Sequence, residues 1–277
     1  MKIFKTSIAL LVTISMMAAC TQGTSNKQDS MNTKKTMSIK EDAVTYTADS
    51  ITMNGFVAYN ENDSAKRPVV LIVHEWWGLT DYPRTRAIQL AELGYLAMAV
   101  DMYGNGKTAD DPKTAGELAG AFYKDPAMAK TRFDAALAKI KTYPQADTTK
   151  IAAIGYCFGG AQVLNMARLG DNLKGVVSFH GTLVGAPADK NLLKAHILVC
   201  HGEADQFVSP AEVAAFKKQM DSIGAAYTFK SYPNATHAFT NPAATAKGEQ
   251  FKIPIAYNAA ADTASWNDMK VFFKDIF

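Results

Sequence analysis

Short, uninterrupted runs of apolar and often β-branched residues alternate along the chain with segments of helical spacing. Such runs are typical of strands that are buried on both faces of a parallel sheet. We expect these strands at residues 68–73, 95–100, 151–156, 175–179 and 196–200, and an alternating strand at 227–232. Helices are predicted at residues 81–93, 109–142 (two helices, separated near Asp125), 161–169, 210–222 and 256–277. Strands that alternate with helices predict an α/β fold with a doubly wound, mostly parallel sheet and helices on both faces.

Two more strands are predicted ahead of the first buried run, at residues 43–47 and 51–59. Asp49-Ser50 has the composition of the turn between them, and Asn54-Gly55 is a candidate bulge. The chain shows no internal repeat. We therefore expect a single folded domain over residues 43–277.

The N-terminal residues 1–20 read as a signal peptide. Two lysines at the start precede an apolar stretch, Ile8–Met17, that is too short to span a bilayer. The sequence Ala18-Ala19-Cys20 at its end resembles a bacterial lipobox, which implies that Cys20 becomes the lipidated N-terminus. The alternative is ordinary cleavage near Ala19, which leaves Cys20 free.

Residues 21–42 are polar and nearly devoid of large apolar side chains. Such a segment cannot bury enough surface to fold, so we predict a flexible tether. The signal peptide and the tether together predict an exported protein of the bacterial cell envelope, which is anchored to the membrane only by a lipid on Cys20.

Composition adds little to this picture. Of the 277 residues, 48% are hydrophobic and 20% are charged, as in ordinary globular proteins, and the formal net charge is +3. A charge this small predicts no nucleic-acid partner. The three cysteines, Cys20, Cys157 and Cys200, lie in different contexts and suggest no disulfide framework; Cys200 falls within an apolar strand and is expected in the core.

The strongest candidate chemistry lies at Gly155-Tyr156-Cys157-Phe158-Gly159, between an apolar run and a helical segment. This is the arrangement of a nucleophile elbow, with a thiol in place of the commoner serine. The tight turn places the central residue in a strained conformation, and the two glycines allow neighbouring backbone to come close. The helix N-terminus that follows favours a thiolate at Cys157.

A thiol nucleophile needs a base, and the base needs an orienting acid. Reactive groups of open α/β sheets gather at the carboxyl ends of the strands. Asp205 follows the strand at 196–200, and His237 follows the strand at 227–232, so the chain order is nucleophile, acid, base. His201 is a rival base and Glu203 a rival acid.

Two backbone N–H groups are expected to form the oxyanion hole. One belongs to Phe158, and we assign the other to Trp76 in the loop after residues 68–73. At least one of Trp76 and Trp77 is expected to wall the pocket, and His74 to be a structural hydrogen-bonding residue. No Cys/His cluster has metal-ligand spacing and no glycine-rich phosphate loop occurs, so neither a metal nor a cofactor is predicted.

Four motifs together resemble the dienelactone hydrolase family: the loop Glu75–Gly78, the Gly-Tyr-Cys-Phe-Gly-Gly elbow, the His-Gly-x-x-Asp acid loop and the His-Ala-Phe base loop. The resemblance implies an α/β-hydrolase fold and a Cys157, Asp205, His237 triad. It also implies hydrolysis of small ester or lactone substrates through a thioester acyl-enzyme. Glu75 matches the family's glutamate near the resting thiol, which is thought to help make the thiolate.

The chain departs from the family's pattern at the substrate carboxylate. Where the best-known members have an arginine in His-x-Phe-x-Arg, this chain has Asn241, and residues 109–124 hold no clear second arginine. Arg84 and Arg86 lie on a predicted helix and are expected to face solvent. The reaction class is therefore better supported than any particular substrate.

A second interpretation is an envelope protein that keeps the fold but binds a ligand without catalysis. A third, peptidase-like or transacylating hydrolase acting on envelope material, is suggested only by the predicted location. His180, at the end of the strand at 175–179, is a further candidate for lining the site.

Overall fold

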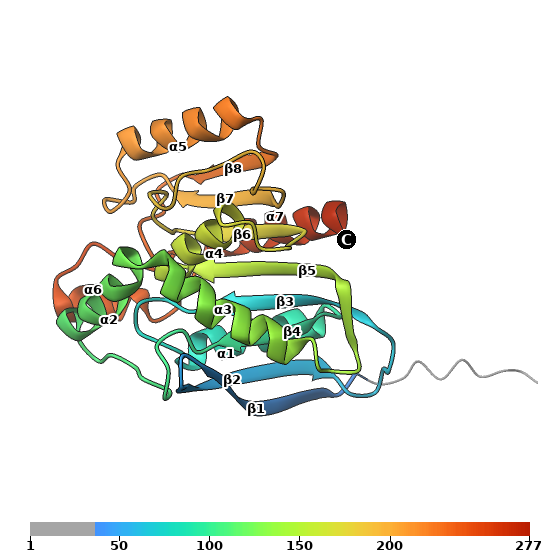
Figure 1. Cartoon of the computed structure of the whole chain (residues 1–277). Coiled ribbons are helices and arrows are strands. Elements are labelled where there is room, and N and C mark those ends of the chain that lie inside the picture. The colour runs from blue at the N-terminus through green and yellow to red at the C-terminus, as the bar shows by residue number, and fades with distance from the viewer. Residues whose placement is uncertain (1–36) are drawn as a thin grey trace, which may run out of the picture. The chain divides into compact units, whose positions relative to one another are not determined.

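In the computed structural model, which describes residues 37–277, eight strands form one sheet with helices on both faces (Figure 1). The strands are β1 (Ile39–Ala48), β2 (Ile51–Asn60), β3 (Arg67–Val73), β4 (Leu96–Val100), β5 (Ala146–Tyr156), β6 (Gly175–Phe179), β7 (His196–Gly202) and β8 (Tyr227–Tyr232). The helices are α1 (Asp81–Glu92), α2 (Pro112–Lys124), α3 (Pro126–Ile140), α4 (Phe158–Arg168), α5 (Pro210–Ile223), α6 (Ala244–Phe251) and α7 (Ala259–Ile276).

The strand order is β1-β2-β4-β3-β5-β6-β7-β8. β2 runs antiparallel to both of its neighbours, and every pair from β4 to β8 is parallel. The predicted doubly wound, mostly parallel sheet of a single α/β domain is confirmed.

Each face of the sheet carries its own apolar core, which explains why the central strands are apolar throughout. On one face, α3, α4 and α5 contribute Phe133, Leu164 and Phe216. On the other face, α1 contributes Leu90 and α7 contributes Phe273. The burial of both faces leaves the strand ends as the place where polar side chains can meet.

Three details differ from the sequence-based expectations. Residues 39–42, expected in the tether, form the start of β1 because β2 extends far enough to pair with them. The prediction of a bulge at Asn54-Gly55 is wrong, since the register between β1 and β2 is unbroken. Packing explains the glycine instead, because a Cβ at Gly55 would lie 2.9 Å from Cε of Met98. Helix α6 lies in a stretch for which no helix was predicted.

The turn between β1 and β2 agrees with expectation. Asp49 and Ser50 have φ values of 49° and 61°, the backbone of a tight hairpin turn whose twist matches that of its strands.

The predicted signal peptide (1–20), its Cys20 and the tether up to residue 36 lie outside the described residues and stay predictions. Among the helices of residues 37–277, none combines the length and the apolar character needed to cross a membrane.

The turn from β5 into α4 packs against the end of β3. A Cβ built on Gly155 would lie 2.0 Å from the carbonyl oxygen of Gly159, and one on Gly159 would lie 2.2 Å from that of Val73. No side chain fits between these backbone segments. Glycine at both positions is what allows the turn to approach β3.

We expect Gly159→Ala to lower the free energy of unfolding by about 3 kcal/mol or more, because the added methyl group meets rigid backbone. Gly116→Ala is the matched control: Gly116 is exposed in α2 with no atom near its Cβ position, so the same change should stabilise by about 0.5–1 kcal/mol. Urea unfolding checks both, and a Gly159→Ala protein as stable as wild type would show that the turn is not tightly packed.

Candidate active site

Cys157 occupies the turn between β5 and α4 with φ 54° and ψ −114°. A residue other than glycine seldom adopts positive φ, and it persists where the surroundings enforce it. The backbone N–H of Cys157 donates to the carbonyl of Phe179 at 3.0 Å and to Nδ1 of His180 at 3.1 Å. These contacts hold the backbone of the turn, so the Cys157 side chain projects from the sheet edge.

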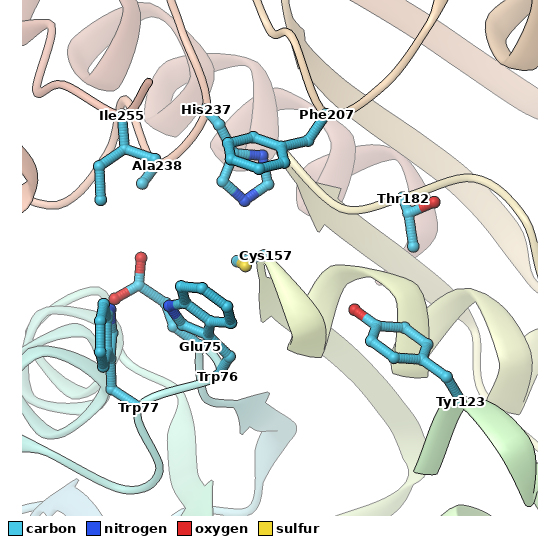
Figure 2. Close-up of a pocket in the computed structure, with 10 residues that line it drawn as sticks. All are labelled: Glu75, Trp76, Trp77, Tyr123, Cys157, Thr182, Phe207, His237, Ala238 and Ile255. Carbon is cyan, nitrogen blue, oxygen red and sulfur yellow. The ribbon is translucent and has the colours of Figure 1, made fainter. Parts of the chain in front are cut away.

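The Cys157 side chain faces a cavity of about 150 Å³ (Figure 2). The walls are mostly apolar, and the Glu75 carboxyl group and the His237 imidazole line the cavity together with the thiol. The cavity is lined by Glu75, Trp76, Trp77, Tyr123, Cys157, Thr182, Phe207, His237, Ala238 and Ile255. A thiol, an imidazole and a carboxyl group thus share a small, mostly apolar space, where electrostatic interactions are strong.

Asp205 and His237 come together from the loops after β7 and β8. Oδ2 of Asp205 lies 2.8 Å from Nδ1 of His237, and both side chains are buried. Oδ1 of Asp205 accepts the backbone N–H of Phe207 at 2.8 Å. The carboxylate therefore fixes the ring so that Nδ1 carries a hydrogen, and the His237 ring lines the same cavity as the Cys157 sulfur (Figure 2).

The pKa of His237 reflects this environment. Burial by itself lowers it, but the Cys157 sulfur and the Asp205 carboxylate outweigh burial and raise the pKa to about 10. The raised pKa favours the protonated ring beside the sulfur.

Glu75 lies in the same cavity and is buried. Burial raises the pKa of its carboxyl group to about 7, while a hydrogen bond from Nδ2 of Asn241, at 2.6 Å from Oε2, works in the opposite direction. Asn241 thus occupies the position where the family's pattern has an arginine, and its uncharged amide donates a hydrogen bond to Glu75. Glu75 changes its charge near neutral pH.

The two predicted oxyanion donors are free to act. Within residues 37–277, the backbone N–H groups of Phe158 and Trp76 have no protein acceptor. Phe158 is the first residue of α4, and Trp76 lies in a turn closed by a bond from Gly78 N to the Glu75 carbonyl at 3.2 Å. Tyr103 donates to the Trp76 carbonyl at 2.9 Å, which holds this peptide in place.

The rival residues are placed elsewhere. Glu203 is exposed, and His201 packs its ring against Phe229, so neither joins the contact between Asp205 and His237. His74 is buried, with Nδ1 2.5 Å from the Glu75 carbonyl and Nε2 accepting the backbone N–H of Met102 at 3.3 Å. Burial lowers its pKa to about 4, so His74 is a neutral support, as expected.

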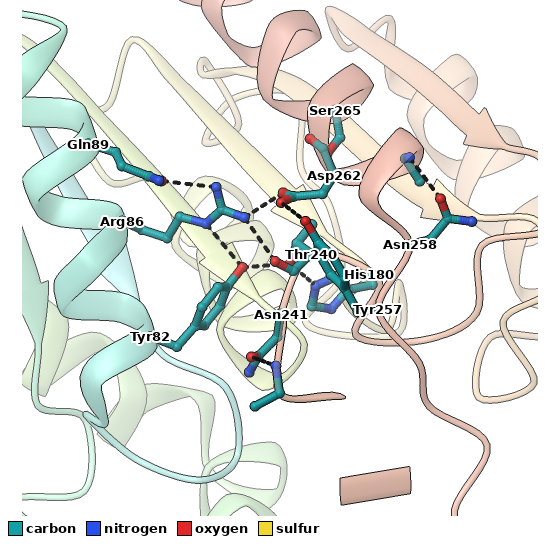
Figure 3. A network of polar contacts seen from close by, with 12 residues as sticks. Tyr82, Arg86, Gln89, His180, Thr240, Asn241, Tyr257, Asn258, Asp262 and Ser265 are labelled. Atoms are coloured by element: carbon teal, nitrogen blue, oxygen red, sulfur yellow. Dashed lines mark hydrogen bonds and ion pairs between the residues drawn. The ribbon is translucent and has the colours of Figure 1, made fainter. Parts of the chain in front are cut away.

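His180 is more closely involved than its place in the sequence suggested. Its Nδ1 accepts the backbone N–H of Cys157, so Nε2 carries the hydrogen and donates to Oγ1 of Thr240 at 2.7 Å (Figure 3). Its φ is 41°, and burial holds its pKa well below the ordinary value. A histidine directly after a buried strand and before a glycine was the only signal in the sequence.

The expectation that Arg86 faces solvent is wrong, because the helix turns this side of α1 towards the base loop. Arg86 is buried and forms an ion pair with Asp262 of α7. It donates to Oη of Tyr82 at 3.2 Å and to the carbonyl of Thr240 at 2.9 Å, and Tyr82 donates to Oγ1 of Thr240 at 2.7 Å (Figure 3). This network anchors the loop that follows His237.

No group of three or more His, Cys, Asp or Glu side chains within residues 37–277 is arranged to hold a metal ion.

We expect Thr240→Val to lower the free energy of unfolding by about 2–4 kcal/mol, because the buried Tyr82 hydroxyl and His180 N–H both lose their acceptor. Thr240→Ser keeps the hydroxyl and should cost about 1 kcal/mol. Urea unfolding of both variants separates the two effects. Equal losses would mean that the hydroxyl contributes nothing.

The buried Glu75 also predicts a pH dependence of stability. Its pKa is about 7 when folded and about 4.5 ordinarily, so the folded state binds the proton more tightly and loses stability as pH rises through this window. Glu75→Gln removes this loss. The free energy of unfolding of the variant relative to wild type should therefore rise by about 2–3 kcal/mol between pH 5 and pH 8.

The exposed Glu203→Gln variant is the control for that measurement and should show a flat difference from wild type. A flat difference for Glu75→Gln as well would contradict the raised pKa.

The chain is similar to known proteins over most of its described length. Residues 53–277 match the sequence model of the "Dienelactone hydrolase family". The crystal structure of P91, a dienelactone hydrolase-like promiscuous phosphotriesterase from metagenomic libraries, superposes with a TM-score of 0.80 at 33% identity, covering 86% of this chain and 99% of P91.

Two curated relatives extend the comparison. The protein "Putative carboxymethylenebutenolidase" of Methylorubrum extorquens is 31% identical over 183 residues, which are 62% of this chain and 63% of that protein. The "Protein usf" of Aquifex pyrophilus is 29% identical over 215 residues, 75% of this chain and 88% of its own length.

Proposed function

Because this chain belongs to the dienelactone hydrolase family and is a carboxylic ester hydrolase, we propose that it cleaves small ester or lactone bonds with Cys157 as the nucleophile. In this proposal His237 is the proton-transfer group and Asp205 orients it. The backbone N–H groups of Phe158 and Trp76 form the oxyanion hole.

The observation that carries the proposal is the 2.8 Å contact between Asp205 and His237 next to a cysteine at a strained strand-to-helix turn. Three loops that are distant in sequence meet at one cavity. A nucleophile, a base oriented by an acid, and two unpaired backbone donors are the parts that acyl transfer needs.

Acylation begins with attack of the Cys157 thiolate on the ester carbonyl carbon. A C–S bond forms, and the carbonyl π-electrons move to the oxygen, which accepts hydrogen bonds from Phe158 and Trp76. The oxyanion then collapses and the C–O bond to the leaving group breaks. Nε2 of His237 gives its proton to the departing oxygen, which yields an alcohol and a thioester; in a lactone the alcohol stays tethered to the acyl group.

Deacylation repeats these steps with water. The neutral His237 takes a proton from water while the water oxygen attacks the thioester carbonyl. Collapse of the second oxyanion breaks the C–S bond and releases the acid. Cys157 leaves as a thiolate, and His237 keeps the proton, which restores the starting pair.

Glu75 tunes the charge of the site in this proposal. A fixed carboxylate in the cavity would repel the thiolate and weaken its formation. With a pKa of about 7, the Glu75 carboxyl group can hold a proton while the sulfur is ionised. It therefore modulates the thiol without touching the bond that breaks.

The site holds no cationic clamp for a substrate carboxylate. Among the described residues that line the cavity there is no arginine or lysine, and Asn241 is occupied by Glu75. We infer that a neutral ester or lactone is turned over without a carboxylate requirement.

The alternative of a non-catalytic binding protein is less well supported. A ligand pocket has no use for a cysteine held at positive φ or for an imidazole with a raised pKa beside it. Positive φ at a residue other than glycine costs stability, and a protein without chemistry at this position has no reason to retain that cost.

We expect Cys157→Ala to reduce kcat/KM for an activated ester such as p-nitrophenyl acetate by roughly 10³-fold or more, because no other group replaces the nucleophile. Cys157→Ser should retain more turnover than Cys157→Ala but far less than wild type, since a serine hydroxyl ionises less readily. Undiminished turnover in Cys157→Ala would refute the proposed mechanism.

Iodoacetamide labelling supplies an internal control in the same molecule. Cys200 is buried and its pKa is raised to about 12 by burial, so it should react slowly, whereas Cys157 should be labelled first. The non-catalytic alternative predicts similar, slow labelling of both cysteines.

A further inference from the structure

A second hollow continues from the catalytic cavity, and nothing in the proposed mechanism uses it. This outer groove, of about 660 Å³, is bordered by Tyr123, Pro126, Asn165, Thr182, Val184 and Pro187. Tyr123 and Thr182 line both spaces, so the groove and the cavity adjoin at these two residues. The cavity itself, at about 150 Å³, has room for only one small side of an ester.

The two spaces lie on defined sides of the sulfur. Figure 2 shows Tyr123 and Thr182 together on one side of Cys157, and Trp77 and Ile255 on the other. A substrate whose carbonyl carbon lies at the sulfur is therefore confined on the side of Trp77. Towards Thr182 it can extend into the outer groove.

One wall of the groove is held in place by hydrogen bonds that are partly or fully buried. Oε1 of Glu212, in α5, accepts two hydrogen bonds of 2.6 Å, one from the Thr182 hydroxyl and one from the backbone N–H of Leu183. Oδ1 of Asn165, in α4, accepts the backbone N–H of Ala186 at 2.9 Å, and Arg168 donates to the Leu183 carbonyl at 2.8 Å. A wall fixed from two helices is preformed, so a ligand need not order it.

The groove presents large apolar side chains to solvent. Val184 is 66% exposed and Tyr123 is 44% exposed, and Phe207, at the rim of the neighbouring cavity, is 49% exposed. An apolar chain laid along them removes both surfaces from water. Within residues 37–277, Lys124 is the only charged residue that lines the groove, so no carboxylate there opposes a neutral or anionic arm.

We propose that the outer groove is a substrate subsite, which binds the longer, apolar arm of an ester whose other side is compact. The inference rests on the proposed function and narrows it. The preferred substrates are esters with a chain of several methylenes on one side of the carbonyl, and small lactones fill only the cavity.

The test measures kcat/KM of the full chain for pairs of esters that differ in one arm. The acyl arm is varied with p-nitrophenyl acetate and p-nitrophenyl hexanoate. The alcohol arm is varied with methyl acetate and hexyl acetate, whose hydrolysis is measured by the release of acid. We expect one pair to show about a tenfold preference for the longer arm, since roughly half of each added methylene is removed from water.

Matched variants tie that preference to the groove. Val184→Asn replaces exposed apolar surface by an amide and should reduce the long-to-short ratio to about twofold. Val271 is a similarly exposed valine, 58% exposed on α7, and Val271→Asn should leave the ratio at its wild-type value.

The outcomes separate the subsite from the proposed function. If the short esters are cleaved in a Cys157-dependent reaction but neither pair shows a preference above twofold, the subsite is refuted and the function stands. An equal ratio in Val184→Asn and wild type also refutes it. If no ester is cleaved in a Cys157-dependent reaction, the proposed function fails and the subsite falls with it.

Discussion

The close approach of the β5–α4 turn to β3 is the constraint on which the site depends. Gly159 lets the turn come close to the Val73 and His74 carbonyls, and Gly155 lets it fold back on itself. This approach holds Cys157 at positive φ and brings the elbow next to the loop that begins at His74. Cys157 and Trp76 thereby line one cavity, and a methyl group at Gly159 would push the elbow away from β3.

Burial then gives each ionisable group near the sulfur a different charge. His74 and His180 have backbone or hydroxyl partners and no hydrogen-bonded carboxylate, so the effect of burial prevails and keeps them neutral. His237 is equally buried, but Asp205 and Cys157 outweigh the desolvation and keep it charged. At Glu75 the Asn241 amide, and after it the charges of His237, Lys247 and Arg86, oppose burial only in part, so its pKa falls between these cases. The charge of each buried side chain is therefore set by its hydrogen-bond and ionic partners and not by how deeply it is buried.

The reaction class and the substrate depend on different parts of the molecule. The parts proposed for catalysis are set by strand ends and one helix N-terminus, which the two cores hold rigidly. The outer groove depends on the α2–α3 corner and the loop at residues 182–187, which lie at the surface. Under the two proposals, loop changes alter the accepted ester without disturbing the groups assigned to bond breaking.

The sequence by itself determined the alternation of strands and helices, the elbow and the order of its partner loops, because these are local patterns of a few residues. Glycine spacing around Cys157 and the placement of Asp205 and His237 after strands belong to this class. Only the tertiary structure decided that Arg86 is buried against Asp262, that His180 holds the elbow, and that Asn241 meets Glu75. Each of these contacts joins segments far apart in the chain, and which distant partners meet is settled by how helices pack on the sheet, which no local pattern records.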